Sequence, residues 1–536
     1  MRRWNGWGDT TIDLELNAAA LGFLTERIGA AQDPADALWS EALAQVQAQP
    51  SRLPPHPLVS IESAERLQAS FGQSLGDWLR LRFGQLGRVT DGVAWPESRE
   101  ELRELLGWAS AIGAVVIPCG GATSVVGHLT PPDGDRPVLT MRLGRLRRLL
   151  ALDPVAQLAT FQAGVAGPDL EAQLRAQGWT LGHYPQSFEY ATLGGWITTR
   201  SSGQQSARYG RIEAMFAGGR LETPRGTLDI PAFPASAAGP DLREWVLGSE
   251  GRLGVLSEAT MRVQRLPECE RFVGVFLPDW PAGEAAAREL AQARLGLSML
   301  RLANPIETVT TLALAGHARA IGWLERALRW RGCGAGKVLL MLGLTGSAAQ
   351  VRAMQAQARA ILRRHGGVST GTVLGRRWQA NRFRGVYLRN ALWAHGYAVD
   401  TMETAVNWPQ VSATVDAIEQ AGHQALQAMG ERTHAYTHLS HVYPQGSSVY
   451  STFVFRIGPD FDHAWARWTA LKRAVSRAIV GQGGTISHQH GVGKDHAPYL
   501  AAEKGEQGLQ AVQALIDHID PQGVMASGNL IQGLPR

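Results

Sequence analysis

Residues 183–203, with the sequence HYPQSFEYATLGGWITTRSSG, carry side chains suited to holding a polar ligand. The segment is crowded with serine, threonine and glycine, and Glu189 and Arg200 are its acidic and basic side chains. Hydroxyl groups both donate and accept hydrogen bonds, and glycine lets a second surface approach the backbone closely. An ordinary helix or strand does not require this composition. The segment therefore predicts the wrapping of a large, flat ligand with polar edges.

A second glycine-rich stretch, PCGGATS at residues 118–124, follows a predicted helix and a predicted buried strand. Ser98 and Glu101 form a capping box at the start of the helix, and residues 114–117 form the strand. A helix, a strand and a glycine-rich turn can direct backbone N–H groups onto a phosphate. A simple tight turn explains the same residues equally well, so both interpretations stay open on this pattern alone.

Histidine pairs occur twice in the C-terminal half of the chain, as His438 with His441 and as His488 with His490. Four imidazoles could bind a transition metal. No Asp, Glu or Cys stands at ligand spacing beside them, so we predict no metal site. His490 lies in an HGVG turn and is the better candidate for an acid–base or hydrogen-bonding group.

Four arginines are candidates for binding an anion, because a guanidinium group pairs bidentately with phosphate or carboxylate. They are Arg301, Arg382, Arg384 and Arg389. Most of the 52 lysines and arginines are expected to be solvated surface groups, so position alone does not decide among them.

The elements that position these residues follow two patterns. Between residues 87 and 267 short strands and helices alternate irregularly, as in an α+β domain. Further along, strands are predicted at 272–276, 298–302 and 338–344, and helices at 281–296, 305–330 and 346–365. This alternation is typical of a ferredoxin-like fold, in which helices cover one face of an antiparallel sheet. Trp4 and Trp7, before these two regions, are expected to dock on the main body.

Composition narrows the class of protein. The chain has 536 residues, 45% of them hydrophobic, which predicts roughly two to four globular domains. A net charge of +5 is too diluted to indicate nucleic-acid binding. Cys119, Cys269 and Cys333 lie far apart, so we expect no disulfide framework and a reducing compartment. No stretch approaches 18 apolar residues, and no apolar core follows Arg2, so the expected location is the cytoplasm.

Two nucleotide-binding motifs, the Walker loop and the Rossmann GxGxxG motif, are absent from the sequence. GAGK at 334–337 is not a Walker loop. The motif requires Gly at the position of Arg331 and Ser or Thr at the position of Val338. No GxGxxG motif follows the first strand of a βαβ unit.

Residues 312–330 place arginine and tryptophan among alanine and leucine. This composition suits either a membrane surface or, as we favour, an ordinary surface helix.

Four separated motifs resemble, in the same order, those of flavoproteins of the vanillyl-alcohol-oxidase type. They are PCGGATS (118–124), QSFEYAT (186–192), TRSS (199–202) and EGRLGVL (250–256). Within these flavoproteins the chain resembles the alkylglycerone-phosphate synthase family, from RWNGWG at residues 3–8 to the histidines near residue 490. The resemblance implies an α+β fold with a PCMH-type FAD-binding domain and a ferredoxin-like cap. It also implies FAD as the cofactor.

The resemblance divides the chain into four parts and assigns residues to the cofactor. The parts are an N-terminal helical extension (1–86), the FAD-binding domain (87–267), a cap or substrate domain (268–455) and a C-terminal helical segment that returns to the flavin (456–536). The expected FAD-binding residues are Pro118, Cys119, Gly120, Gly121, Ala122, Thr123, Ser124, Gln186, Ser187, Phe188, Glu189, Tyr190, Ala191, Thr192, Thr199, Arg200, Ser201, Ser202, Glu250, Gly251, Arg252, Leu253, Gly254, Val255 and Leu256.

The family reaction implied by this resemblance replaces the acyl chain of acyl-dihydroxyacetone phosphate with a fatty alcohol, through an adduct at the flavin N5. Tyr450, His183, His488, His490 and Arg389 match residues needed for catalysis. Arg301 and Arg389 match residues that contact the substrate. His128 lies outside the Gly120–Ser124 loop, which itself offers no attachment point, so FAD is expected to be held non-covalently.

Two positions depart from the family pattern. Gln489 stands where the synthases have a histidine, and Gln186 stands where they have an aspartate. An amide does not exchange a proton near neutral pH, so an acid–base role at position 489 is lost.

Two other functions stay open beside the synthase. FAD-linked D-2-hydroxy-acid dehydrogenases hold a metal with two histidines and a glutamate. His441 fits the first ligand, but Tyr450 and Gln489 occupy the other two positions, which disfavours this reaction. A flavin- and lipid-binding protein without turnover is the third alternative. In each case the expected partner is a small-molecule or lipid substrate, not nucleic acid; peripheral membrane contact and a homodimer are left open.

Overall fold

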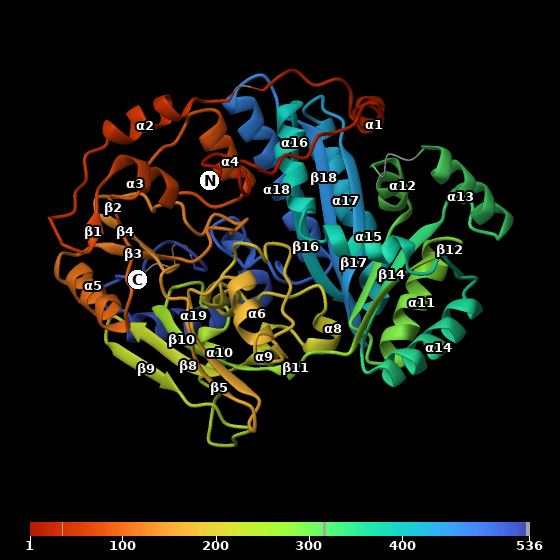
Figure 1. Ribbon diagram of the computed structural model, residues 1–536. Coiled ribbons are helices and arrows are strands. Elements are labelled where there is room, and N and C mark those ends of the chain that lie inside the picture. Colours follow the sequence, from red (N-terminus) through yellow and green to blue (C-terminus); the bar gives the residue numbers. More distant parts are fainter. Residues whose placement is uncertain (35, 315–317, 532–536) are drawn as a thin grey trace.

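The computed structural model describes residues 1–34, 36–314 and 318–531. It is an α+β fold, with sheets of four and five strands on one side and a seven-stranded sheet on the other (Figure 1). The last part of the chain, drawn in blue, returns from the large sheet to the smaller ones, where the C-terminal end lies. Residues 532–536, at the end of the predicted 456–536 segment, lie outside the described residues.

The N-terminal extension is helical, as predicted, but it also contributes a strand. Its helices are α1 (Ala18–Ile28), α2 (Trp39–Gln47), α3 (Ser63–Ala69) and α4 (Leu75–Arg82). The short strand β1 (Val59–Ser60) pairs with β2 (Gly92–Ala94) and so joins the first sheet. The extension is therefore part of the main body.

The first sheet has the strand order β1-β2-β4-β3 and ends at the glycine-rich loop. Strands β2, β4 (Val138–Arg142) and β3 (Val115–Cys119) are parallel. Helix α5 (Arg99–Ala111) begins where Ser98 accepts a hydrogen bond from the Glu101 amide, and it buries Leu102, Leu105 and Leu106. The predicted order of helix, buried strand and turn is confirmed.

The second sheet is antiparallel, with the order β5-β6-β10-β8-β9. Its strands are β5 (Leu149–Asp153), β6 (Leu158–Gln162), β8 (Phe216–Thr223), β9 (Gly226–Ile230) and β10 (Val255–Arg262). The shorter elements around it are α6 (Gly167–Arg175), β7 (Trp179–Thr180), α7 (Leu193–Thr198), α8 (Ser206–Tyr209), α9 (Ile212–Met215), α10 (Arg243–Val246) and β11 (Gln264–Arg265). Helix α7 lies inside the hydroxyl-rich segment 183–203.

The seven-stranded sheet contains the ferredoxin-like order that the sequence predicts. Its strands are β12 (Cys269–Leu277), β13 (Met299–Ala303), β14 (Val338–Gly346), β15 (Val368–Ser369), β16 (Tyr397–Asn407), β17 (His434–Val442) and β18 (Gly446–Arg456). The order β15-β12-β14-β13 is the antiparallel 4-1-3-2 arrangement of a ferredoxin-like unit. Strands β17, β18 and β16 extend the sheet beyond β13, and β16 was not predicted.

Helices cover both faces of this sheet, whereas the sequence predicted one covered face. Residues of α11 (Trp280–Gln292), α14 (Ala348–Arg364), α17 (Val411–Gln427) and α18 (Phe461–Gly481) share one hydrophobic core with the sheet. Leu312 of α12 (Pro305–Leu314) and Leu328 of α13 (Ala318–Trp330) pack with Phe272 and Phe276 on the other side. The predicted helix 305–330 is thus two helices, and residues 315–317 of that prediction lie outside the described part of the chain.

Three further helices carry or follow site residues: α15 (Val373–Asn381), α16 (Leu388–Ala394) and α19 (Ala501–Ile519). After α19 the chain joins the first sheet, where the Val116 amide donates to the Val524 carbonyl at 2.7 Å. The segment between α18 and α19 contains His488 and His490 and reaches the junction of the sheets.

Removing a large side chain from the core of the seven-stranded sheet should lower stability. Phe453 on β18 is fully buried, and its ring lies where a side chain at Gly422 of α17 would sit, only 2.2 Å from an added Cβ. We expect Phe453→Ala to lower the free energy of unfolding by about 3 to 5 kcal/mol, measured by urea titration with circular dichroism. Val155→Ala, at a residue 93% exposed, is the control and should change it by less than about 0.5 kcal/mol. Equal urea midpoints for the two variants would contradict this packing.

Candidate active site

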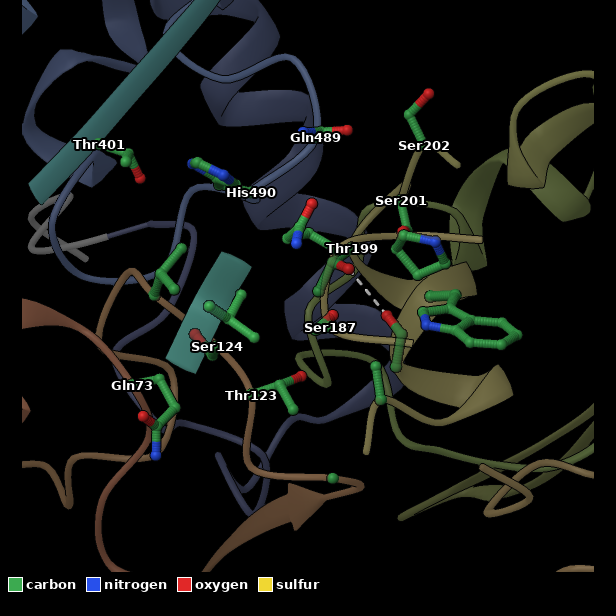
Figure 2. A pocket seen from close by; sticks show the side chains of 18 of the residues that line it. Gln73, Thr123, Ser124, Ser187, Thr199, Ser201, Ser202, Thr401, Gln489 and His490 are labelled. Atoms are coloured by element: carbon green, nitrogen blue, oxygen red, sulfur yellow. Dashed lines mark hydrogen bonds between the residues drawn. The ribbon is translucent and has the colours of Figure 1, made fainter. Parts of the chain in front are cut away.

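A cavity of about 630 Å³ lies where the smaller sheets meet the seven-stranded sheet (Figure 2). Its wall includes parts of all four predicted cofactor motifs. The predicted residues that line it are Pro118, Gly120, Gly121, Ala122, Thr123, Ser124, Gln186, Ser187, Ala191, Thr192, Thr199, Ser201, Ser202, Glu250, Gly251, Gly254, Val255, Leu256, Arg301, Arg389, Tyr450 and His490. The other predicted residues do not line it: Cys119, His183, Phe188, Glu189, Tyr190, Arg200, Arg252, Leu253 and His488.

Glycine is required in the 118–124 loop because the next cofactor motif packs directly against it. A Cβ added at Gly120 would lie 2.1 Å from the Thr192 hydroxyl oxygen, and one at Gly121 would lie 1.8 Å from the Tyr190 carbonyl oxygen. Ala122 has a φ of +53°, in the left-handed region. The loop and residues 190–192 therefore form one continuous surface of the cavity.

The hydroxyls of the 183–203 segment organise that surface. Thr192 caps helix α7 by accepting from the Gly195 amide at 3.4 Å, and the Thr199 hydroxyl donates to the Gly195 carbonyl at 2.8 Å. Ser201 and Ser202, at the end of this segment, also line the cavity (Figure 2). The hydroxyl-rich composition thus serves both the fold of the turn and the lining of the cavity.

Glu250 connects the fourth motif to the C-terminal segment. Its carboxylate is 2.8 Å from His128 Nε2 and accepts hydrogen bonds from the amides of Val492 and Gly493 at 2.5 and 2.8 Å. The Ser124 hydroxyl, which lines the cavity, lies 2.5 Å from His128 Nδ1. This chain of contacts joins the glycine-rich loop, the EGRLGVL motif and the returning C-terminal segment.

The cavity suits FAD. Glycine loops, hydroxyl groups and arginines line one continuous space, and such groups hold phosphate oxygens and the polar edge of a flavin. The Nε and Nη2 atoms of Arg389 are buried and have no hydrogen-bond partner among the described residues. The same holds for the Oδ1 atom of Asn529. Sequence analysis missed Asn529, because no motif marks it and only the return of the C-terminal chain brings it to the cavity.

Tyr450 lies beside a buried charged cluster on the seven-stranded sheet. In the strand register it is opposite His438, and the two rings stack with centroids 4.9 Å apart. His438 Nδ1 is 2.9 Å from a Glu307 carboxylate oxygen, and Arg301 binds the other oxygen at 2.5 Å. Burial alone would raise the pKa of Glu307, but His438 and Arg301 hold it below its ordinary value. Arg301 therefore faces the cavity with part of its charge balanced.

The Tyr450 side chain is a neutral hydrogen-bonding group near pH 7. Burial raises the pKa of its hydroxyl to about 12. The His490 ring meets the Tyr450 ring edge-on, with centroids 5.5 Å apart. Burial also lowers the pKa of His490, so its imidazole is available as a proton acceptor at neutral pH.

Glu403, on the unpredicted strand β16, holds the turn that carries both histidines. Its Oε1 atom accepts hydrogen bonds from the amides of Gln489 and His490 at 2.6 and 2.8 Å. Its carboxylate also lies 3.4 Å from His488 Nδ1. Burial alone would raise the pKa of Glu403, but His490, His488 and the Gln489 amide hold it well below the usual range. Acidic residues inside the strand-like run YAVDTMETAV were the one sequence signal for this group.

Gln489, the departure from the family pattern, is hydrogen-bonded to His441. Its Oε1 atom lies 3.0 Å from His441 Nε2. His441 Nδ1 lies 3.1 Å from the Ser206 hydroxyl and 3.3 Å from that of Ser202. His488 stacks on His441 instead of facing the cavity, and its Nε2 is 2.7 Å from the Tyr443 hydroxyl. In the described part of the chain, no group of three or more His, Cys, Asp or Glu is arranged to hold a metal ion.

His183 does not line the cavity, although the resemblance matches it to a residue needed for catalysis. It is 1% exposed, packs on Trp196 and lies 3.1 Å from the Ser201 hydroxyl. Burial, and then the Arg211 charge, lowers its pKa to about 3, so the ring is neutral. The structure places His183 behind Ser201, where it orients that hydroxyl.

The remaining predicted polar residues divide between the cavity and the surface. Arg382 lines the cavity with its guanidinium 4.4 Å from the Tyr184 ring centroid, while Arg384 is exposed. The Gln186 amide donates to the Arg382 carbonyl at 2.9 Å. Gln186 thus takes part in the junction between the two halves through its amide.

The chain is similar to known flavoproteins along most of its length. It matches the families FAD binding domain over residues 90–229 and FAD linked oxidases, C-terminal domain, over residues 266–530. It is 31% identical to an alkyldihydroxyacetonephosphate synthase of Dictyostelium discoideum, covering 87% of this chain and 77% of that protein. The corresponding protein of Caenorhabditis elegans is 30% identical, with coverage of 88% and 81%. A solved structure of alkyldihydroxyacetonephosphate synthase superposes with a TM-score of 0.81 at 27% identity over 99% of both chains.

Neutralising Glu403 should loosen the histidine turn in a pH-dependent way. Removing one charged partner of a buried ion pair typically costs about 3 kcal/mol of stability. We therefore expect Glu403→Gln to lower the free energy of unfolding by roughly that amount at pH 7. Because its folded pKa is depressed, the carboxylate stabilises the fold above its unfolded pKa and loses this effect as the pH falls through the folded value. The difference between wild type and variant, measured by urea titration, should therefore shrink toward low pH. A difference that is the same at pH 7 and at pH 4 would contradict the assignment.

Proposed function

Because the chain belongs to the alkyldihydroxyacetonephosphate synthase family and binds FAD, we propose that it exchanges the acyl chain of acyl-dihydroxyacetone phosphate for a fatty alcohol. The observation that carries the proposal is the set Arg301, Arg389, Tyr450 and His490 in one cavity with the cofactor motifs. An anionic headgroup and an acid–base step both have candidate side chains there.

Arg389 supports the binding of a phosphate. Its Nη1 donates to the Gln73 carbonyl, while Nε and Nη2 have no partner among the described residues. Burial lowers its pKa to about 10, which leaves the guanidinium charged at neutral pH. A buried, charged donor with unused N–H groups is suited to a phosphate or carboxylate. Arg301, on β13, supplies a second positive group in the cavity wall.

In the proposed exchange, the bond between the acyl oxygen and the dihydroxyacetone carbon breaks, and the chain leaves as a carboxylate. The alcohol oxygen forms the new ether bond, so its proton must be accepted. Neutral His490 is positioned to take that proton, and the neutral Tyr450 hydroxyl can donate a hydrogen bond to a substrate oxygen. Bound FAD would supply a ring that accepts and returns electron density. There is no net oxidation in the overall exchange.

The D-2-hydroxy-acid dehydrogenase alternative has less support. Tyr450 and Gln489 stand where that group has metal ligands, and His441 is engaged with Gln489. The third alternative, a flavin- and lipid-binding protein without turnover, rests on Gln489 in place of a histidine. The Tyr450 hydroxyl and the His490 imidazole in the cavity favour turnover instead.

The test is exchange of labelled fatty alcohol into an ether product, with FAD content measured on the same samples. Tyr450→Phe should keep FAD and lower turnover about 100-fold or more, as expected for loss of a hydrogen-bond donor to a reacting substrate oxygen. Tyr397→Phe is the matched control, because that hydroxyl donates to the Gly29 carbonyl and does not line the cavity. Unchanged exchange in Tyr450→Phe would remove Tyr450 from the mechanism. Bleaching of the flavin by a 2-hydroxy acid, without exchange, would favour the dehydrogenase.

We also propose that α13 contacts a lipid surface that supplies the substrates. Trp323 and Trp330 on this helix are 68% and 86% exposed, and Arg326 and Arg329 are exposed beside them. The opposite face of the helix buries Leu328 against the cap. Exposed tryptophan together with arginine suits the interface of an anionic membrane. No helix in the described ranges is long and apolar enough to cross a membrane.

Replacing both tryptophans should weaken lipid binding without affecting the cavity. We expect Trp323→Ser with Trp330→Ser to lower sedimentation with phosphatidylcholine–phosphatidylglycerol vesicles at least several-fold, because interfacial binding scales with buried apolar area. Trp245→Ser, at a residue 36% exposed on α10, is the control. Equal sedimentation of the double variant and the control would exclude α13 as the contact.

A further inference from the structure

The N-terminal residues 2–9 form a hairpin that lies against the cofactor loop. Arg2 and Asp9 make an isolated bridge, and the Arg3 amide donates to the Gly8 carbonyl at 2.8 Å. Gly8 closes the hairpin with a φ of +78°, and a Cβ there would lie 2.3 Å from the Tyr387 ring. The glycine is needed both for the backbone conformation and for the close packing.

Arg2 touches two cofactor motifs at once. Its Nη2 donates to the carbonyl of Gly121 in the glycine-rich loop. Its guanidinium carbon lies 4.9 Å from the ring centroid of Tyr190 in the second motif. The Gly121 backbone is therefore held between the Tyr190 carbonyl on one side and Arg2 on the other.

Two positive charges lie behind this loop. Arg142, at the end of β4, has its Nη1 3.9 Å from Cys119 Sγ, at the start of the loop. The described residues place no carboxylate within ion-pair distance of Arg2 or Arg142. Uncompensated guanidinium groups next to a loop that turns N–H groups toward a ligand favour an anion there.

Trp7, on the return arm of the hairpin, is itself part of the cavity wall. It is 5% exposed, lines the cavity and meets the Tyr190 ring edge-on at 5.8 Å. Asn390 fixes its position, accepting from the Trp7 amide at 3.0 Å and donating to the Trp7 carbonyl at 2.9 Å. Asn390 follows Arg389 on α16, so the hairpin connects the cofactor loop to the proposed substrate arginine.

We propose that the hairpin 2–9 is a component of the FAD site: Arg2 supports the glycine-rich loop and attracts the pyrophosphate, and Trp7 closes the cavity beside it. This role extends the cofactor site to a segment that carries none of the four motifs. It does not depend on which reaction the enzyme performs.

The test measures release of FAD from the holoprotein after dilution, followed by the rise in flavin fluorescence. Arg2→Met should release FAD at least tenfold faster than wild type, and Arg2→Lys should lie between the two because it keeps the charge. Raising the potassium chloride concentration should speed release from wild type more than from Arg2→Met, since salt screens the charge that the variant lacks. Arg145→Met is the matched control, because Arg145 is a surface arginine paired with Glu97.

Asn390→Ala provides a second route to the same measurement, because it frees Trp7 without touching Arg2. It should also release FAD faster than the Arg145→Met control. Urea midpoints at saturating FAD show whether each variant is folded. Release rates equal to the control in both folded variants, Arg2→Met and Asn390→Ala, would overturn the proposal. A salt dependence of Arg2→Met identical to wild type would exclude the electrostatic part.

Discussion

A carboxylate buried between two layers of the protein constrains most of the active site. Glu403 is 1% exposed, and the loss of its hydration must be offset by donors in a fixed arrangement. Those donors are backbone amides of the turn that carries His488 and His490, so the turn can have only one position relative to β16. Tyr450, paired with Glu403 across the same sheet, is thereby held at a set distance from His490.

The cofactor half depends on a similar arrangement built around Glu250. Its carboxylate binds amides of the C-terminal segment and His128, which in turn contacts Ser124 of the glycine-rich loop. The two carboxylates thus hold neighbouring turns of one segment, 487–493, from opposite sides. Substrate chemistry and cofactor binding meet there, because a single short segment is positioned by both halves of the molecule.

Local patterns predicted many of the elements, and the resemblance supplied the cofactor motifs. The Ser98 N-cap, the buried strand after the helix and the glycine-rich loop are all local, and each is found where the sequence placed it. The second half of the predicted capping box is absent, because the Glu101 carboxylate accepts from the Glu97 amide instead of the Ser98 amide. Glu403, Asn529 and Trp7 were missed because their roles arise from contacts between segments distant in sequence, which no local periodicity records. The position of His183 behind Ser201 could not be predicted for the same reason, because a match in sequence does not give the direction of the ring.

The cavity wall contains Trp7 near one end of the described chain and Asn529 near the other, and the Val116 amide of β3 donates to the Val524 carbonyl. A polypeptide still emerging from the ribosome therefore lacks one wall of the flavin site and one edge of its first sheet until the last helix has been synthesised. The complete wall of the cavity exists only once residues 524–529 have been added, so a chain that stops short of them has an open flavin site and an uncovered edge at β3.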